Sequence, residues 1–91
     1  GFEHGFEATS KARLTLFEKP YTALADQPNP QPIMGSSSRV TSSAFMGDEA
    51  AQLQLLLPAT AEMDMAVNIF TYQSGAALPQ VEVHVMEHGL I

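Results

Sequence analysis

Three side chains near the end of the 91-residue chain are of the types that bind divalent metals. Glu82, His84 and His88 lie in the run V-E-V-H-V-M-E-H over residues 81–88. In an extended strand, residues an even number of positions apart point to the same face, so these three converge if the strand continues through residue 87. Two imidazoles and a carboxylate suit manganese, iron, nickel or zinc, and three protein ligands leave coordination positions open for substrate or water. The spacing therefore predicts a catalytic metal site.

Two other interpretations of this segment stay open. Residues 84–88 also read H-x-x-E-H, the signature of inverted zinc peptidases, which needs a helix to bring its two histidines together. Valine at alternate positions and the glycine at position 89 favour a strand instead. The remaining interpretation is a surface strand whose exposed face happens to carry one glutamate and two histidines.

Short strands are expected to position these side chains. Residues 12–17 mix polar residues with β-formers and are followed by Pro20, residues 65–72 are rich in β-branched and aromatic residues, and residues 81–86 alternate strictly. Residues 50–57 suit a helix or a strand, and we prefer a strand because the next run is strand-like. Residues 20–38 hold four prolines, one glycine and three serines, so they form a connector without regular structure. Short strands without a long helix predict an all-β sandwich or barrel.

Composition argues against several classes of partner. The 10 acidic residues and 4 Lys and Arg give a net charge of −6, which disfavours nucleic acid and anionic membranes. Cysteine is absent, so disulfides and thiolate zinc sites are excluded. The sequence has no apolar stretch of the roughly 20 residues that cross a bilayer, and no signal-peptide pattern at its start. We expect a cytoplasmic protein, and both ends suggest an internal segment of a longer chain.

The metal-capable residues resemble the cupin motif, in which a glycine precedes H-x-H and a later carboxylate on the strands of a small jelly-roll barrel. Gly75, Glu82, His84 and His88 look like this motif with Glu and His exchanged at the outer ligand positions. The resulting E-x-H-x-x-x-H form is similar to the second barrel of the bicupin (S)-ureidoglycine aminohydrolase family. The runs F-E-K-P-Y at 17–21, M-D-M at 63–65 and S-G-A at 74–76 also look like counterparts in that family.

The resemblance implies a cupin fold and a set of site residues. Residues 1–19 would be the closing strands of a first barrel, residues 20–43 a connector, and residues 44–91 the opening strands of a second barrel. Glu82, His84 and His88 would bind a divalent metal, typically manganese, and Glu82 would also act in catalysis by anchoring the substrate amine. The family's fourth ligand, a glutamine on a later strand, falls outside this sequence. His4 looks like the tail of a first-barrel motif, but a lone histidine is a weak signal, and we favour a structural or surface role.

The implied activity is hydrolysis of (S)-ureidoglycine to (S)-ureidoglycolate and ammonia in allantoin breakdown, a part of purine catabolism. The expected partners are a small-molecule substrate and further copies of the chain, in a homo-oligomer. Two alternatives stay open. The same ligand set binds iron, so another cupin enzyme such as a dioxygenase or an isomerase is compatible with it. A non-enzymatic cupin that binds a small molecule needs no open coordination position.

Overall fold

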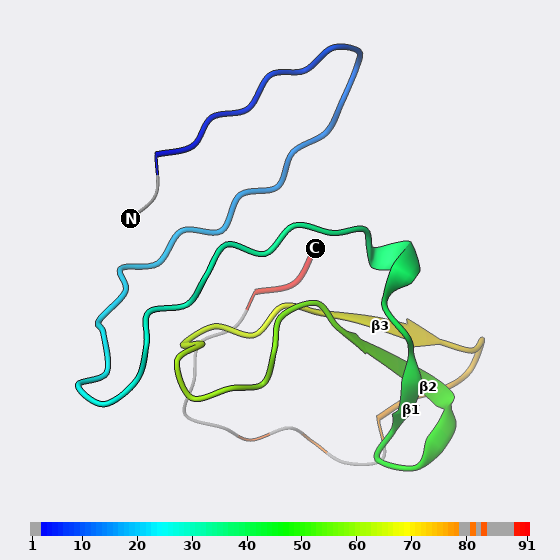
Figure 1. The fold of residues 1–91 in the computed structure, drawn as a ribbon. Coiled ribbons are helices and arrows are strands. Elements are labelled where there is room, and N and C mark those ends of the chain that lie inside the picture. The colour runs from blue at the N-terminus through cyan, green and yellow to red at the C-terminus, as the bar shows by residue number, and fades with distance from the viewer. Residues whose placement is uncertain (1–2, 79–80, 82, 84–88) are drawn as a thin grey trace.

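The computed structural model describes residues 3–78, 81, 83 and 89–91 (Figure 1). Regular structure in this part of the chain is sparse: a 3-10 turn, η1 (Ser37–Arg39), and three strands, β1 (Ser43–Phe45), β2 (Asp48–Leu55) and β3 (Asn68–Tyr72). The described residues contain no α-helix, which agrees with the predicted all-β class. Accordingly, none of them belongs to a helix long and apolar enough to cross a membrane.

The three strands form one antiparallel sheet in the order β1-β2-β3. Leu53 of β2 lies opposite Ser43 on one side and Phe70 on the other, so β2 is paired along both edges. The strands predicted over residues 50–57 and 65–72 are confirmed as β2 and β3, with shifted ends. For the first of these runs, alternation of Gln with Leu and Ala predicted the outcome better than the helix propensity of the same residues.

β1 was not predicted as a separate strand. It joins β2 through Met46 and Gly47, whose φ angles of 53° and 82° are both positive, as in the two-residue turns that match the twist of a hairpin. The pairing shifts register between Ala44 and Phe45, and beside this irregularity the Asp48 carboxylate accepts a hydrogen bond from the Ala50 N–H at 2.9 Å. The turn gave a poor sequence signal because its first position usually holds Asn, Asp or Gly, whereas here it holds Met.

One face of the sheet carries the aromatic side chains. The rings of Phe45 and Phe70 meet edge to face with centroids 5.1 Å apart, and the rings of Phe70 and Tyr72 stack at 6.0 Å. Directly opposed residues share a face, so Ala51 lies beside Tyr72, and Ala51 is fully buried. This aromatic face, defined by Phe45, Ala51, Phe70 and Tyr72, is where the described residues come closest to a hydrophobic core.

The N-terminal part of the chain is extended but belongs to no strand of the described structure. Residues 3–19 form two arms that run back alongside each other after a bend at residues 9–11 (Figure 1). The prediction of a strand over residues 12–17 is therefore wrong for the described structure, because an extended segment becomes a strand only when a neighbour accepts its hydrogen bonds. Residues 20–36 contain no helix or strand, as expected for the connector, although η1 begins at Ser37, inside the stretch predicted to be irregular.

Two side chains form hydrogen bonds between segments that are far apart in the sequence. Gln54 of β2 contacts η1, and Lys19 of the second arm contacts Asp64 in the loop before β3. The Gln54 amide donates to the carbonyl oxygens of Ser37 at 2.9 Å and Val40 at 2.7 Å, so a residue of β2 holds both sides of η1. Lys19 donates to the carboxylate of Asp64 at 2.8 Å and to its carbonyl oxygen at 2.9 Å. The Lys19–Asp64 pair is substantially exposed, so most of its Coulomb energy is screened by water.

A tight turn follows β3, a few residues before the predicted metal ligands in the sequence. The Ala76 N–H bonds to the Gln73 carbonyl at 2.9 Å, and Gly75 has a φ angle of 83°. A left-handed φ at this position is strained for any residue with a Cβ, although the space around Gly75 is open. Backbone conformation, and not crowding, is therefore what requires glycine here.

We predict that Gly75→Ala lowers the free energy of unfolding by about 1 kcal/mol, because alanine resists the left-handed conformation. Gly35→Ala is the matched control, since its Cβ also meets open space but its backbone has no positive φ angle. The control should leave stability unchanged or raise it by up to about 1 kcal/mol. Urea denaturation measures both, and equal losses would contradict the turn geometry.

Replacing Gln54 by Leu should cost about 1–2 kcal/mol of stability, because two backbone carbonyl oxygens lose their side-chain donor. Gln52→Leu provides the comparison on the same strand and the same face. Among the described residues its amide bonds to nearby Glu49, where water can take its place, so the change should stay within about 0.5 kcal/mol. The prediction fails if thermal and urea unfolding give the two variants the same stability.

Candidate functional site

The three predicted metal ligands, Glu82, His84 and His88, lie outside the described residues, so their convergence stays a prediction. Val81 and Val83 of the same segment are described; both are exposed and neither belongs to a strand. The strand predicted over residues 81–86 is therefore not seen at these two positions, and its other residues are not described.

The described structure does define the approach to this segment. The Gln73 N–H bonds to the Ala50 carbonyl at 2.9 Å, which continues the pairing with β2 just beyond the end of β3. The turn at Gly75 follows directly. Among the described strands β3 lies at one edge of the sheet, so a further strand formed by the following residues has an edge available to it.

The carboxylates near the sheet are already engaged in structural contacts. Asp48 accepts the hydrogen bond from Ala50, Asp64 pairs with Lys19, and Glu49 accepts one from Gln52 at 3.2 Å. Within residues 3–78 and the few described beyond them, no three His, Cys, Asp or Glu side chains gather as a metal site would require. The described part of the chain thus contains no second candidate metal site beside the predicted ligands at residues 82, 84 and 88.

His4 is exposed and belongs to the first of the two arms. Its ring meets that of Phe6 edge to face with centroids 5.9 Å apart. This contact fits the structural or surface role that we favoured over a metal-ligand role.

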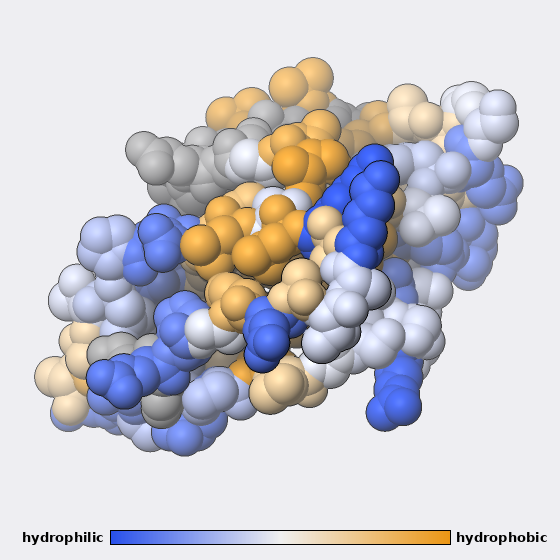
Figure 2. Space-filling view, turned by 90° about the horizontal axis from the view of Figure 1, so that it is seen from above, coloured by the Kyte–Doolittle hydropathy of each residue, from blue (hydrophilic) through white to orange (hydrophobic). Residues whose placement is uncertain are grey.

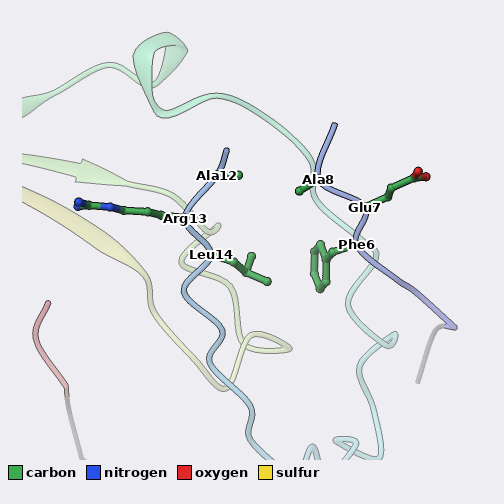
Figure 3. Close-up of a pocket in the computed structure, with 6 residues that line it drawn as sticks. All are labelled: Phe6, Glu7, Ala8, Ala12, Arg13 and Leu14. Atoms are coloured by element: carbon green, nitrogen blue, oxygen red, sulfur yellow. The ribbon is translucent and has the colours of Figure 1, made fainter. Parts of the chain in front are cut away.

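A shallow hollow of about 390 Å³ lies between the two arms (Figure 3). Phe6 and Leu14 extend toward each other across it, whereas the charged ends of Glu7 and Arg13 point away in different directions. Binding sites for polar substrates bring several polar groups together, and this hollow does not. It is an apolar contact surface without the means for catalysis.

The aromatic face was not predicted from the sequence. Phe70 and Tyr72 stand two positions apart in a strand-like run, and this spacing alone placed them on one side of β3. The contribution of Phe45 could not be found in the same way, because it depends on the unpredicted hairpin turn at Met46 and Gly47.

Comparison with known proteins supports the resemblance found in the sequence. The chain is 30% identical over 90 residues to (S)-ureidoglycine aminohydrolase of Arabidopsis thaliana, covering 99% of this chain and 30% of that protein. It is also 30% identical over 89 residues to a probable (S)-ureidoglycine aminohydrolase of Oryza sativa subsp. japonica, covering 98% of this chain and 28% of the relative. No protein-family model matches the chain, and no solved structure matches it.

The similarity spans almost the whole chain but less than a third of each relative, so it relates this sequence to one part of a longer protein. Both relatives carry the same activity in their names, and the resemblance suggested by the E-x-H-x-x-x-H run is confirmed. The chain is thus similar, from end to end, to a segment of the (S)-ureidoglycine aminohydrolases.

Proposed function

We propose that this chain supplies the metal-binding strand of an enzyme that hydrolyses (S)-ureidoglycine to (S)-ureidoglycolate and ammonia. The observation that carries the proposal is the 30% identity to two (S)-ureidoglycine aminohydrolases over nearly every residue of the chain. The all-β character of the described residues agrees with a cupin barrel, to which residues 44–91 would contribute the opening strands.

The chemistry of the donor set fits a divalent cation. Glu82, His84 and His88 offer one carboxylate and two neutral imidazoles, a combination suited to manganese and its neighbours. A bound cation of this kind orients the substrate and stabilises negative charge that develops during hydrolysis.

The three side chains divide the work in this proposal. His84 and His88 would hold the metal through ring nitrogens. Glu82 would contribute a carboxylate oxygen to the metal, and its negative charge would also anchor the substrate amine. Alternation along a strand is essential to the proposal, because it would place these three groups on one face and would turn Glu87 to the other.

The carboxylate pair Glu82 and Glu87 provides a direct test of the activity. Full-length protein supplied with Mn²⁺ and freshly generated (S)-ureidoglycine should release ammonia above the rate of spontaneous decay. Glu82→Gln should reduce that rate by about 100-fold or more, because it removes a charged metal ligand. Glu87→Gln should leave it nearly unchanged.

Other results would point to other functions. No ammonia above background in the wild-type protein would contradict the proposed reaction. Loss of activity in Glu87→Gln together with cleavage of peptides would favour the H-x-x-E-H peptidase, in which this glutamate is the general base. Oxygen uptake by the iron-loaded protein would favour a dioxygenase.

Metal content tests the ligand set apart from the reaction. His84→Ala and His88→Ala should each weaken Mn²⁺ binding by at least about tenfold, measured by calorimetry on protein first stripped with chelator. His4→Ala is the matched control and should bind the metal like the wild type. Unaltered binding in both His84→Ala and His88→Ala would place the metal elsewhere.

A further inference from the structure

The β2–β3 loop, residues 56–67, has few main-chain hydrogen bonds to hold its shape. The Leu56 N–H bonds to the Val67 carbonyl at 2.8 Å and closes the base of the loop. Within this described segment, the other main-chain bond joins the Met63 N–H to the Thr60 carbonyl at 3.1 Å. A loop with so few restraints opens at a small cost in free energy, so one further contact is enough to change its population of open states.

Lys19 makes such a contact from outside the loop. Its ammonium group donates to the Asp64 carboxylate at 2.8 Å and to the Asp64 carbonyl oxygen at 2.9 Å, across 45 residues of sequence. The two partners belong to the runs at 17–21 and 63–65 that stood out in the sequence. Because one of the two bonds goes to the main chain, the contact depends on the backbone conformation of the loop as well as on opposite charge.

The backbone on both sides of the contact is restricted before the contact forms. Pro20 disfavours helical angles for the residue before it, so Lys19 is kept in an extended conformation. The turn closed by Thr60 and Met63 comes directly before Asp64. Forming the contact therefore orders little additional backbone, which lowers its cost in conformational entropy.

The contact is open to solvent and therefore to salt. Figure 2 shows that hydrophilic residues surround a central apolar patch on the surface of the molecule. The side chains of Lys19 and Asp64 are 50% and 39% exposed, so their charges are solvated in the same way. The screening length of an electrolyte falls from about 10 Å at 0.1 M to about 3 Å at 1 M, and exposed ion pairs weaken accordingly.

We propose that the Lys19–Asp64 contact is a salt-sensitive restraint on the β2–β3 loop. While the contact is made, the second arm and the loop before β3 move together, although residues 20–36 between them contain no helix or strand. When salt screens the contact, the loop opens and the sheet stays intact. The proposal is independent of the metal chemistry.

Hydrogen exchange on the complete protein encoded by its gene tests this restraint. The Met63 amide reports on the loop, and the Gln73 amide, bonded to the Ala50 carbonyl at 2.9 Å, reports on the sheet. At low salt, Lys19→Met should accelerate exchange at Met63 by about fivefold and leave exchange at Gln73 within about twofold of the wild type. An unchanged rate at Met63 would overturn the proposal, and so would equal acceleration at both amides, which indicates a general loss of stability.

Lys11→Met is the matched control, since it removes the same charge from an exposed lysine in the bend between the arms. It should leave exchange at Met63 unchanged. In about 1 M sodium chloride the wild type and Lys19→Met should differ by less than about twofold at Met63, because the contact is already screened. A full difference at high salt would show that the restraint is not salt-sensitive, and an equal effect of the control would show that net charge alone is responsible.

A double substitution tests whether Asp64 is the partner through which Lys19 acts. Asp64→Asn added to Lys19→Met should accelerate exchange at Met63 no further, because both changes remove the same contact. Asp26→Asn is the matched control for the lost carboxylate, at another exposed aspartate, and should have no effect by itself. Additive effects of the two substitutions would contradict the proposal. Ammonia release is not a readout here, so failure of this proposal is distinguishable from failure of the proposed function.

Discussion

Pairing of β2 along both of its edges is the interaction on which the described fold depends. β1 and β3 each have one described neighbour, and that neighbour is β2 in both cases. β2 also carries Gln54, which holds η1, and Ala51, which is fully buried beside the aromatic face. Since an isolated hairpin is only marginally stable, the third strand and its aromatic contacts are needed for the sheet to persist.

The need of each strand for a hydrogen-bonded neighbour explains why the C-terminal half of the described chain contains a sheet and the N-terminal half does not. In the sheet, each strand finds a neighbour within about 20 residues along the sequence, so its hydrogen bonds are satisfied locally. Residues 12–17 have a comparable strand-like composition but no described neighbour, and they remain extended and exposed. The Lys19–Asp64 pair brings the second arm to the loop before β3 without supplying strand partners.

Sequence patterns predicted the fold where the physical cause was local. The connector followed from prolines, and β2 and β3 followed from alternation and from β-branched and aromatic residues. β1 was missed because its turn uses Met46 at a position of positive φ, where another residue type is usual. The strand over residues 12–17 was wrong because composition reports the capacity to pair and carries no information about whether a neighbour is present.

For the candidate site too, the sequence predicts which residues share a face but not which strands lie next to them. Alternation predicts that Glu82, His84 and His88 share a face, and similarity to the aminohydrolases supports the chemistry that such a face would perform. Whether the face is enclosed depends on neighbouring strands, as it does for residues 12–17. A carboxylate and two imidazoles on an open edge strand would be solvated and would compete with water for a cation, whereas inside a barrel they would be held together with their hydration removed. The turn at Gly75 and the position of β3 at an edge among the described strands therefore matter to the proposed metal site as much as the ligands, because they would determine where a ligand strand could add to the sheet.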